Sequence, residues 1–415
     1  MTPIQYRAGD VILDDLPYAV AVNIDYAKSA CSFCFNSGTP AECAGCNKIV
    51  YCDEQCQEND SVDHRVECEV LAGCEEMPDE EQRLVIRTLA KFLRERDQPT
   101  VGDYFGRPRT INNLLSHVED LNKSERAEVT ARADEILELL DGRLDVDQDL
   151  VVEMIMKCRI NRYCLTYHNE PNFFVRGQVV YLAASSIDHT CVINEQYTYL
   201  FDGRRIILRA LTDFTLDDPN SLRIHYLSSI MPYEQRRSTT LDTYFFLCSC
   251  DKCVREARAP ELEPEQKQKA EEAAAEIDAL YEGSRTTEEW YKEGSQILAK
   301  YEKVLQNDSV LLWLVGQLQL SAVELELLEE SLRLGARTLQ QSETVLSMEP
   351  VLYNMCYAMS RLGWNSKDNK NHKAFLKGQR LTKSLFKISH GRDHQIVKWL
   401  ESFEQPGAAN EVQQA

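Results

Sequence analysis

Residues 31–68 read CSFCFNSGTPAECAGCNKIVYCDEQCQENDSVDHRVEC and contain seven cysteines and one histidine. Their spacing is Cys31-x2-Cys34-x8-Cys43-x2-Cys46-x5-Cys52-x3-Cys56-x7-His64-x3-Cys68. Tetrahedral zinc binds thiolate and imidazole, and each Cys-x2-Cys turn lets two sulfurs approach one ion. The spacing therefore predicts two closed zinc sites, in a segment too short and too polar to fold without metal. The alternative is a cluster of reduced thiols that holds no ion.

The composition of the whole chain indicates a globular protein that does not bind nucleic acid. Its 415 residues are 43% apolar, which is enough for about two to four packed domains. The formal charge is -21, whereas nucleic-acid affinity comes mostly from Lys and Arg contacts to phosphate. Direct DNA binding is not expected, and the partners should be proteins or small molecules.

The sequence carries no sign of a membrane or a secretory route. No window approaches the roughly eighteen apolar residues that span a bilayer, and the start, MTPIQYRAGD, lacks the regions of a signal peptide. We therefore expect a cytoplasmic or nuclear protein without a membrane partner. In that reducing setting, most of the 15 cysteines should be metal ligands or buried thiols.

Helix-like and strand-like stretches divide the remaining chain. In residues 79–100 and 111–140, apolar residues recur at intervals of three and four positions, which predicts amphipathic helices. Short β-rich runs fill 173–227, with Asp202-Gly203 as a hairpin signal. Beyond Pro264 the periodicity is helical, which predicts an array of paired helices similar to a tetratricopeptide stack, although no clean 34-residue repeat is present.

A second cysteine cluster follows the β-rich region. Cys248, Cys250 and Cys253 offer three ligands, whereas a closed zinc site needs four. A fourth ligand must come from elsewhere in the chain.

The segment 31–68 resembles a MYND finger, and the surrounding chain is similar to the SET and MYND domain (SMYD) protein lysine methyltransferases. The resemblance implies an α+β protein: a split SET β-fold interrupted by a two-zinc MYND finger and a helical insert, then a zinc-binding post-SET segment and a tetratricopeptide-like helical C-terminal domain. The implied domains are the N-terminal part of SET with a truncated start (1–30), the finger (31–68), the insert (69–150), the C-terminal part of SET (151–247), the post-SET segment (248–256) and the helical domain (257–415).

The resemblance also implies how the metal ligands combine into three zinc sites. In the finger, one ion would take Cys31, Cys34, Cys52 and Cys56, and the other Cys43, Cys46, His64 and Cys68. The run SSIDHTC at 185–191 is similar to a SET motif, so Cys191 would complete the site of Cys248, Cys250 and Cys253. The alternative is that Cys191 is a buried thiol and the other three are reduced.

Two tyrosines, Tyr226 and Tyr244, match those that line the lysine channel of SET enzymes. Methyl transfer to lysine is an in-line displacement from the sulfonium of S-adenosylmethionine, so the enzyme must position a neutral amine. An aromatic channel removes water, which disfavours the ammonium form, and a tyrosine hydroxyl can orient the amine. Taken alone, a tyrosine on an alternating strand would be assigned to the core.

The cofactor residues implied by the resemblance are Asn161, Ser185, Asp188, His189 and Phe246, with Phe246 near the adenine. Two of them have structural alternatives. Asn161 can be a turn or a helix cap. His189 can be a core histidine whose ring nitrogens meet backbone carbonyls.

The chain departs from the family at three places. The family has a Gly-x-Gly stretch upstream of the segment that reads RAGDVIL here, and only six residues precede Arg7, so we expect either that the first SET strands are missing from this form or that cofactor binding is impaired. Asp188 stands where the family usually has Asn, and a carboxylate cannot donate as an amide does. Gln55 matches the groove that binds proline-rich peptides, but Ser61 stands where the family commonly has Trp, which should weaken that docking.

The resemblance implies S-adenosylmethionine-dependent transfer of a methyl group to a lysine of a histone or another protein. The alternative is a catalytically inactive SET and MYND adaptor that recruits proteins, which the missing glycine motif favours. Tyr226, Tyr244 and the third cysteine group favour the enzyme, because an adaptor has no need of the channel tyrosines.

Overall fold

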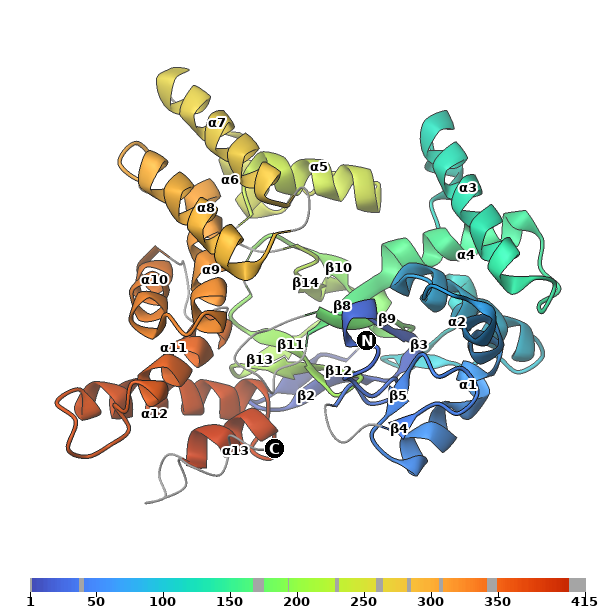
Figure 1. Cartoon of the computed structure of the whole chain (residues 1–415), viewed down its shortest axis with the longest axis horizontal. Coiled ribbons are helices and arrows are strands. Elements are labelled where there is room, and N and C mark those ends of the chain that lie inside the picture. The colour runs from blue at the N-terminus through green and yellow to red at the C-terminus, as the bar shows by residue number, and fades with distance from the viewer. Residues whose placement is uncertain are drawn as a thin grey trace.

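Short strands occupy the middle of the molecule, with helices on both sides (Figure 1). A computed structural model describes residues 2–36, 41–166, 175–192, 194–227, 231–258, 264–281, 285–305, 309–341 and 349–402. Helices α1 to α4 lie on one side of the strands, and helices α7 to α13 lie on the other. This mixed helix and sheet content agrees with the α+β prediction.

Two antiparallel sheets of three strands form the centre. One has the order β11-β12-β2 and the other has the order β3-β9-β8. Their strands are β2 (Val11–Asp15), β3 (Pro17–Val22), β8 (Arg162–Thr166), β9 (Val175–Tyr181), β11 (Tyr197–Asp202) and β12 (Arg205–Ala210). Strands from before the cysteine-rich segment thus pair with strands from far beyond it, and the two parts share one core.

The β11–β12 turn confirms the hairpin predicted at Asp202-Gly203. Asp202 pairs with Arg205 at the end of the ladder, and Gly203 has a φ of 58°. That conformation is open to glycine at little cost, so the strands can reverse within two residues.

Within the described ranges, four further pairs of very short strands are present. They are β1 (Ile4–Tyr6) with β13 (Phe214–Leu216), β4 (Ala41–Glu42) with β5 (Val50–Tyr51), β6 (Gly102–Tyr104) with β7 (Arg107–Arg109), and β10 (Asp188–His189) with β14 (Arg223–Ile224). The β10–β14 pair is parallel. It brings residues 188–190 beside the segment that leads to Tyr226.

Helices α1 (Glu54–Gly73), α2 (Glu80–Arg94), α3 (Lys123–Leu140) and α4 (Gln148–Asn161) follow the first cysteines. The helix predicted over 79–100 is present as α2. It starts at a capping box of Asp79 and Gln82 and ends at Arg94, six residues earlier than predicted. The helix predicted over 111–140 is wrong in its first part, where the chain forms two short 3-10 turns. A second capping box, of Asn122 and Glu125, starts α3 only at Lys123.

The described residues of the last third of the chain are mainly helical, as predicted. After α5 (Tyr233–Tyr244) and α6 (Asp251–Ala257) come α7 (Pro264–Tyr281), α8 (Thr287–Tyr301), α9 (Ser309–Glu324), α10 (Leu328–Gln341), α11 (Glu349–Arg361), α12 (His372–Ser389) and α13 (Gln395–Ser402). From α7 onward, successive helices pack against each other, and α12 also contacts β11 and β12. The tail after Pro406 lies outside the described residues.

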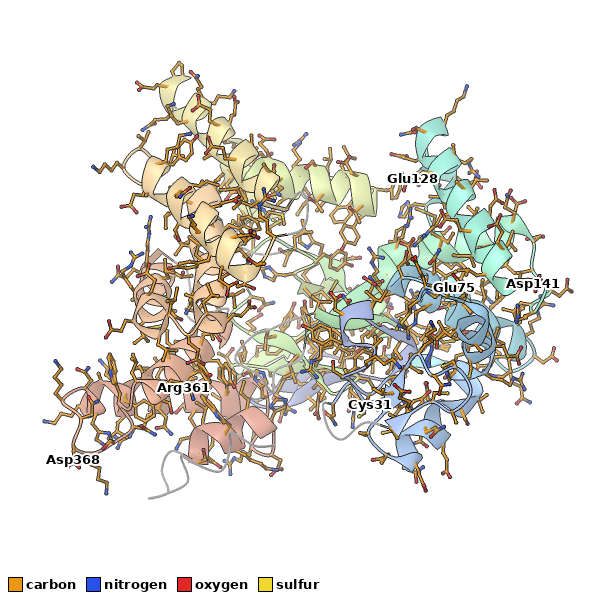
Figure 2. The ribbon with its side chains drawn as sticks, in the orientation of Figure 1. Cys31, Glu75, Glu128, Asp141, Arg361 and Asp368 are labelled. Atoms are coloured by element: carbon orange, nitrogen blue, oxygen red, sulfur yellow. The ribbon has the colours of Figure 1, made fainter. Side chains whose placement is uncertain are left out.

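Many side chains of the helices project away from the central strands (Figure 2). Glu75, Glu128 and Asp141, around α1 and α3, are exposed, in keeping with the acidic composition. Within the part of the chain that the structure describes, no helix has the length and apolar character to cross a membrane.

Candidate functional site

The eight metal-ligand candidates of the finger fall into two groups in space. One group is Cys31, Cys34, Cys52 and Cys56, and the other is Cys43, Cys46, His64 and Cys68. Within each group the ligand atoms all lie within 4.8 Å of one another. This is the interleaved arrangement that the family resemblance implied.

The third group joins two distant parts of the chain. Cys191, just after β10, lies with Cys248, Cys250 and Cys253 at the start of α6, again with all sulfurs within 4.8 Å. The sulfur of Cys191 is 3.8 Å from that of Cys248 and 3.6 Å from that of Cys253. The distant fourth ligand that the cluster requires is therefore within reach.

The donor sets fit zinc. A tetrahedral ion with zinc–sulfur bonds of about 2.3 Å separates its sulfurs by about 3.8 Å. Sulfur pairs in the finger agree, with 3.6 Å between Cys34 and Cys52 and 3.7 Å between Cys43 and Cys68. All of these cysteines are free thiols rather than disulfides. The clusters therefore support zinc binding.

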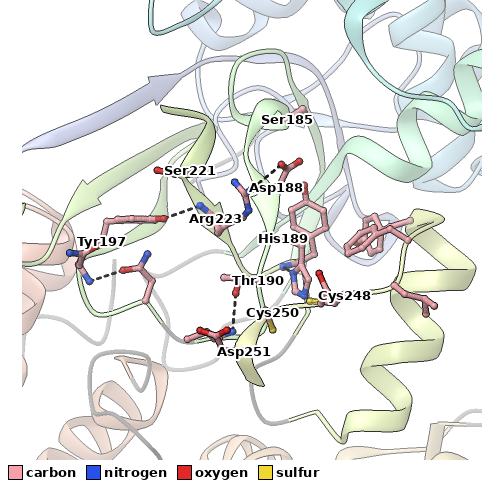
Figure 3. Close-up of a pocket in the computed structure, with 18 of the residues that line it drawn as sticks. Ser185, Asp188, His189, Thr190, Tyr197, Ser221, Arg223, Cys248, Cys250 and Asp251 are labelled. Carbon is pink, nitrogen blue, oxygen red and sulfur yellow. Dashed lines mark hydrogen bonds and ion pairs between the residues drawn. The ribbon is translucent and has the colours of Figure 1, made fainter. Parts of the chain in front are cut away.

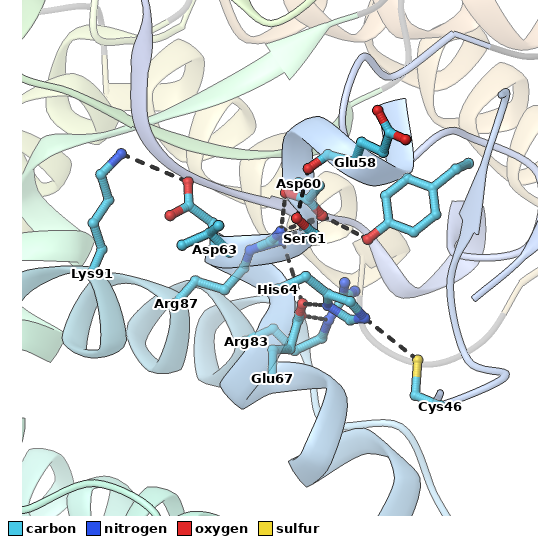
Figure 4. A network of polar contacts seen from close by, with 12 residues as sticks. Cys46, Glu58, Asp60, Ser61, Asp63, His64, Glu67, Arg83, Arg87 and Lys91 are labelled. Carbon is cyan, nitrogen blue, oxygen red and sulfur yellow. Dashed lines mark hydrogen bonds and ion pairs between the residues drawn. The ribbon is translucent and has the colours of Figure 1, made fainter. Parts of the chain in front are cut away.

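A buried network of charges attaches the second finger group to α2 (Figure 4). Nδ1 of His64 lies 2.7 Å from the carboxylate of Glu67, which is fully buried. Arg83 donates from Nε to Glu67 at 2.7 Å and from Nη1 to the carbonyl of Val22, on β3, at 2.7 Å. Arg87 also donates to Glu67, at 3.4 Å, and pairs with Asp60. A single carboxylate thus connects a metal ligand to a helix and, through Arg83, to a strand.

The pKa of Glu67 reflects this network. Burial alone would raise the pKa of the carboxyl, but the guanidinium groups of Arg83 and Arg87 hold it well below its usual range. Glu67 is therefore ionised, and its hydrogen bond orients the His64 ring, as carboxylates commonly do for metal-binding histidines.

A cavity of about 1000 Å³ lies beside the third cysteine group (Figure 3). Its lining includes every predicted catalytic and cofactor residue, namely Asn161, Ser185, Asp188, His189, Tyr226, Tyr244 and Phe246. Cys248 and Cys250 line the same cavity. Residues separated by as much as 85 positions in the chain, from Asn161 to Phe246, thus meet at one place.

A smaller cavity of about 140 Å³ adjoins the large one. Both are lined by Ile160, Asn161, Ser185, Tyr226 and Tyr244. Two further tyrosines, Tyr163 and Tyr199, line the small cavity alone. Neither tyrosine was singled out from the sequence, because nothing in the neighbouring residues distinguishes a cavity-lining tyrosine from a core tyrosine.

Tyr226 stands between the two cavities. Its hydroxyl donates to the carbonyl of Ile187 at 2.7 Å, and its ring centroid is 5.0 Å from that of Tyr244. Burial, with smaller contributions from Asp188 and Tyr244, raises the pKa of Tyr226 well above its ordinary value. Burial also raises the pKa of Tyr244. Both side chains are neutral phenols at physiological pH.

His189 is held by both of its ring nitrogens. Nδ1 accepts from the backbone N–H of Tyr226 at 3.0 Å, and Nε2 lies 3.1 Å from the sulfur of Cys191. Burial lowers the pKa of the imidazole to about 4. The ring is buried, as the structural alternative expects, and its nitrogens meet a backbone N–H and a cysteine sulfur. The ring still lines the large cavity.

Asn161 is the last residue of α4. Its side-chain amide donates to the carbonyls of Lys157, one turn earlier, and of Leu115, both at 2.9 Å. The amide nitrogen thus bonds the last turn of α4, whose C-cap is Arg162, while Asn161 also lines both cavities.

The remaining cofactor candidates differ in their partners. Ser185 donates its hydroxyl to the carbonyl of Tyr181. Asp188 is 73% exposed at its side chain and forms an ion pair with Arg223 at 3.6 Å. Phe246 lies with its ring centroid 6.0 Å from that of His189. Arg223 was not singled out from the sequence, because its contact with Asp188 depends on the pairing of two short strands.

The insert and the segment after α5 meet at one wall of the large cavity. The ring of His117 stacks on that of Phe245, with centroids 5.1 Å apart and planes 10° apart. Both residues have a positive φ, of 50° and 60°, which costs free energy in a residue other than glycine. Both line the cavity.

Comparisons with known proteins agree with this geometry. The MYND finger family model matches residues 31–68. The chain is 22% identical over 412 residues to N-lysine methyltransferase SMYD2 of Sus scrofa, covering 94% of this chain and 92% of that protein. It is 24% identical over 417 residues to histone-lysine N-methyltransferase SMYD3 of Homo sapiens, covering 96% and 92%.

A third relative is matched over a shorter part. SET domain-containing protein 14 of Caenorhabditis elegans is 28% identical over 251 residues, which is 59% of this chain and 56% of that protein. The chain thus spans little more than half the length of this relative. Together, the MYND match and the near-full-length alignments support assignment to the SET and MYND domain (SMYD) lysine methyltransferase family.

Proposed function

We propose that this protein transfers a methyl group from S-adenosylmethionine to a lysine side chain of a histone or another protein. One observation carries the proposal: a cavity large enough for a nucleoside cofactor adjoins a small tyrosine-lined cavity, and Tyr226 and Tyr244 line both. Relatives named as lysine methyltransferases support the same activity. In this proposal, strands β2 and β3 and the strands after Asn161 are the two parts of a split SET domain.

The donor set of the large cavity fits the cofactor. It presents aromatic rings at Tyr226 and Phe246 and a carboxylate at Asp188, which suit an adenine and a cationic amino-acid chain. When bound, S-adenosylmethionine supplies an electrophilic methyl group on its sulfonium. The side chains of the protein position the lysine amine and remove water from around it.

The small cavity suits the lysine side chain. Tyr163, Tyr199, Tyr226 and Tyr244 surround it with aromatic surface, which excludes water and lowers the pKa of an amine. Burial raises the pKa of Tyr199 to about 12, and raises those of the other three above their ordinary value. These phenols remain protonated, so they orient the amine by hydrogen bonds and do not act as bases. The amine must lose its proton to solvent before transfer.

We also propose three zinc ions, one in each cysteine group. Two would fold the finger, where Glu67 orients His64. The third would tie the start of α6 to Cys191, and so hold the wall formed by Cys248 and Cys250 beside the large cavity.

Protein partners follow from the activity, and the finger offers a second contact surface. Gln55 and Ser61 are exposed on α1, and Gln55 donates to Asn59 at 3.3 Å. We propose that proline-rich peptides dock weakly here, because Ser61 provides no aromatic platform. An NMR titration with such a peptide should shift resonances around Gln55. An unchanged spectrum would show that proline-rich peptides do not bind at this surface.

The function is tested by methyl transfer from labelled S-adenosylmethionine to a protein extract, for wild type and Tyr226→Phe. The variant keeps the ring and loses the hydroxyl, so labelling should fall by about tenfold or more. Tyr357→Phe, whose hydroxyl contacts Glu326 in the helical array, should label like wild type. Equal labelling by Tyr226→Phe would remove its proposed role. No labelling by wild type would favour the adaptor.

A further inference from the structure

The large cavity is rich in acidic side chains and poor in basic ones. Asp188, Glu195 and Asp251 line it. Among its described lining residues, Arg223 is the one Lys or Arg. Among the residues that the structure describes, Arg223 is therefore the cationic side chain that can bind a ligand carboxylate in this cavity.

Arg223 and Asp188 are placed side by side by the backbone. They are directly opposed in the parallel β10–β14 pair, and Nη2 of Arg223 lies 3.6 Å from Oδ2 of Asp188 (Figure 3). Nη1 of Arg223 donates to the carbonyls of Asn220 and Leu222 at 2.5 and 2.7 Å. Its backbone N–H donates to the hydroxyl of Tyr197 at 2.8 Å. One edge of the guanidinium is thus anchored to the protein, and Nη2 faces the carboxylate.

This ion pair does little for stability. The side chains are 39% and 73% exposed, and an exposed pair of this kind contributes almost nothing to the free energy of folding. The same exposure leaves both charges accessible to a ligand in the cavity. An α-amino acid group carries an ammonium and a carboxylate on one carbon, so it matches two opposite charges that are held next to each other.

We propose that Arg223 binds the α-carboxylate of the methyl donor while Asp188 accepts a hydrogen bond from its α-ammonium. The guanidinium of Arg223, the ligand carboxylate, the ligand ammonium and the carboxylate of Asp188 then alternate in sign. Arg223 is in this role a binding residue that determines specificity for amino-acid-bearing nucleosides. The inference rests on the proposed function, because it concerns the cofactor of that reaction.

The test is calorimetric titration of the zinc-loaded full chain with two ligands. One is S-adenosylhomocysteine, and the other is its analogue that lacks only the α-carboxylate. Arg223→Gln should weaken binding of S-adenosylhomocysteine by about tenfold to 100-fold, as expected for loss of a charge-assisted hydrogen bond. Binding of the analogue should not change. Arg223→Lys, which keeps the charge, should retain most of the affinity.

A matched control is Arg205→Gln. Arg205 also forms an exposed ion pair with an aspartate, Asp14, with the arginine side chain 46% exposed, but it does not line the cavity. Both ligands should bind this variant as they bind wild type.

The outcomes separate this inference from the function on which it rests. If wild type binds neither ligand, both the proposed function and the inference are overturned. If wild type binds S-adenosylhomocysteine and Arg223→Gln binds it equally well, only the inference fails. The inference also fails if Arg223→Gln weakens the binding of both ligands equally, or if wild type binds both ligands with the same affinity. Should Arg223→Gln not fold, the wild-type comparison of the two ligands still decides.

Discussion

Nδ1 of His189 accepts a hydrogen bond from the backbone N–H of Tyr226 at 3.0 Å. Because Nδ1 is the acceptor, the neutral ring carries its proton on Nε2, which faces the sulfur of Cys191 at 3.1 Å. One imidazole therefore links the third cysteine group to the tyrosine that stands between the two cavities.

His189→Ala should disturb both ends of this link. It leaves the N–H of Tyr226 without its acceptor, which costs about 1–3 kcal/mol of unfolding free energy, and it frees the Tyr226 backbone to move. We expect a lower thermal midpoint and methyl transfer reduced by about tenfold or more. His372→Ala, which removes a histidine hydrogen-bonded to Trp364 in the helical array, should leave transfer intact. A His189→Ala protein that is less stable yet fully active would refute the positioning role.

Metal analysis of the purified protein should give three zinc ions per chain. Cys248→Ala should lower the count to two, because the remaining three ligands no longer close the site. Cys74→Ala should leave it at three, since Cys74 belongs to none of the ligand groups. A wild-type count of two would eliminate the third site, whereas equal counts for the two variants would show that Cys248 is not a ligand.

Glu67→Gln should strongly destabilise the protein. The substitution leaves Arg83 and Arg87 buried without their shared carboxylate, and such a loss costs about 3–5 kcal/mol. Glu69→Gln, at a 60% exposed side chain 3.9 Å from Arg143, should cost about 1 kcal/mol or less. Urea midpoints of the zinc-loaded proteins, followed by circular dichroism, compare the two. Similar midpoints would contradict a structural role for the buried network.

The pH dependence of transfer should contain no tyrosine ionisation near the ordinary pKa of about 10. Burial raises the pKa values of Tyr226 and Tyr244, so the neutral phenols that we propose to be active persist to higher pH. Between about pH 8 and pH 10, the rate should therefore rise as the substrate amine loses its proton, without a falling limb. A decline near pH 10 that disappears in Tyr244→Phe would overturn this expectation.

The sequence predicted the parts of this protein in which local spacing determines the structure. Cysteine spacing predicted two metal sites in the finger, Asp202-Gly203 predicted the hairpin, and periodicity predicted α2. In each case the residues that decide the structure lie close together in the chain. The resemblance to a family added Cys191, Tyr226 and Tyr244, which the structure brings to one cavity.

Features that depend on distant pairing were not predictable in the same way. The contact of Arg223 with Asp188 arises from the register of β10 against β14, and two-residue strands leave no alternating pattern to recognise. The helix predicted from residue 111 failed for a different reason. Apolar periodicity was present, but His117 adopts a left-handed conformation, and the helix starts only at the capping box of Asn122 and Glu125.

The pairing of β2 with β12 has a consequence for how the chain folds. Arg205 and Asp14 contact each other across 191 positions of sequence, and closing so long a loop is slow and entropically costly. The finger and helices α1 to α4 lie inside that loop and can form from local contacts. Zinc uptake by the finger and formation of these helices shorten the effective loop before the strands meet. We therefore expect refolding to be limited by the final joining of the two sheets, and to be fastest when zinc is present from the start.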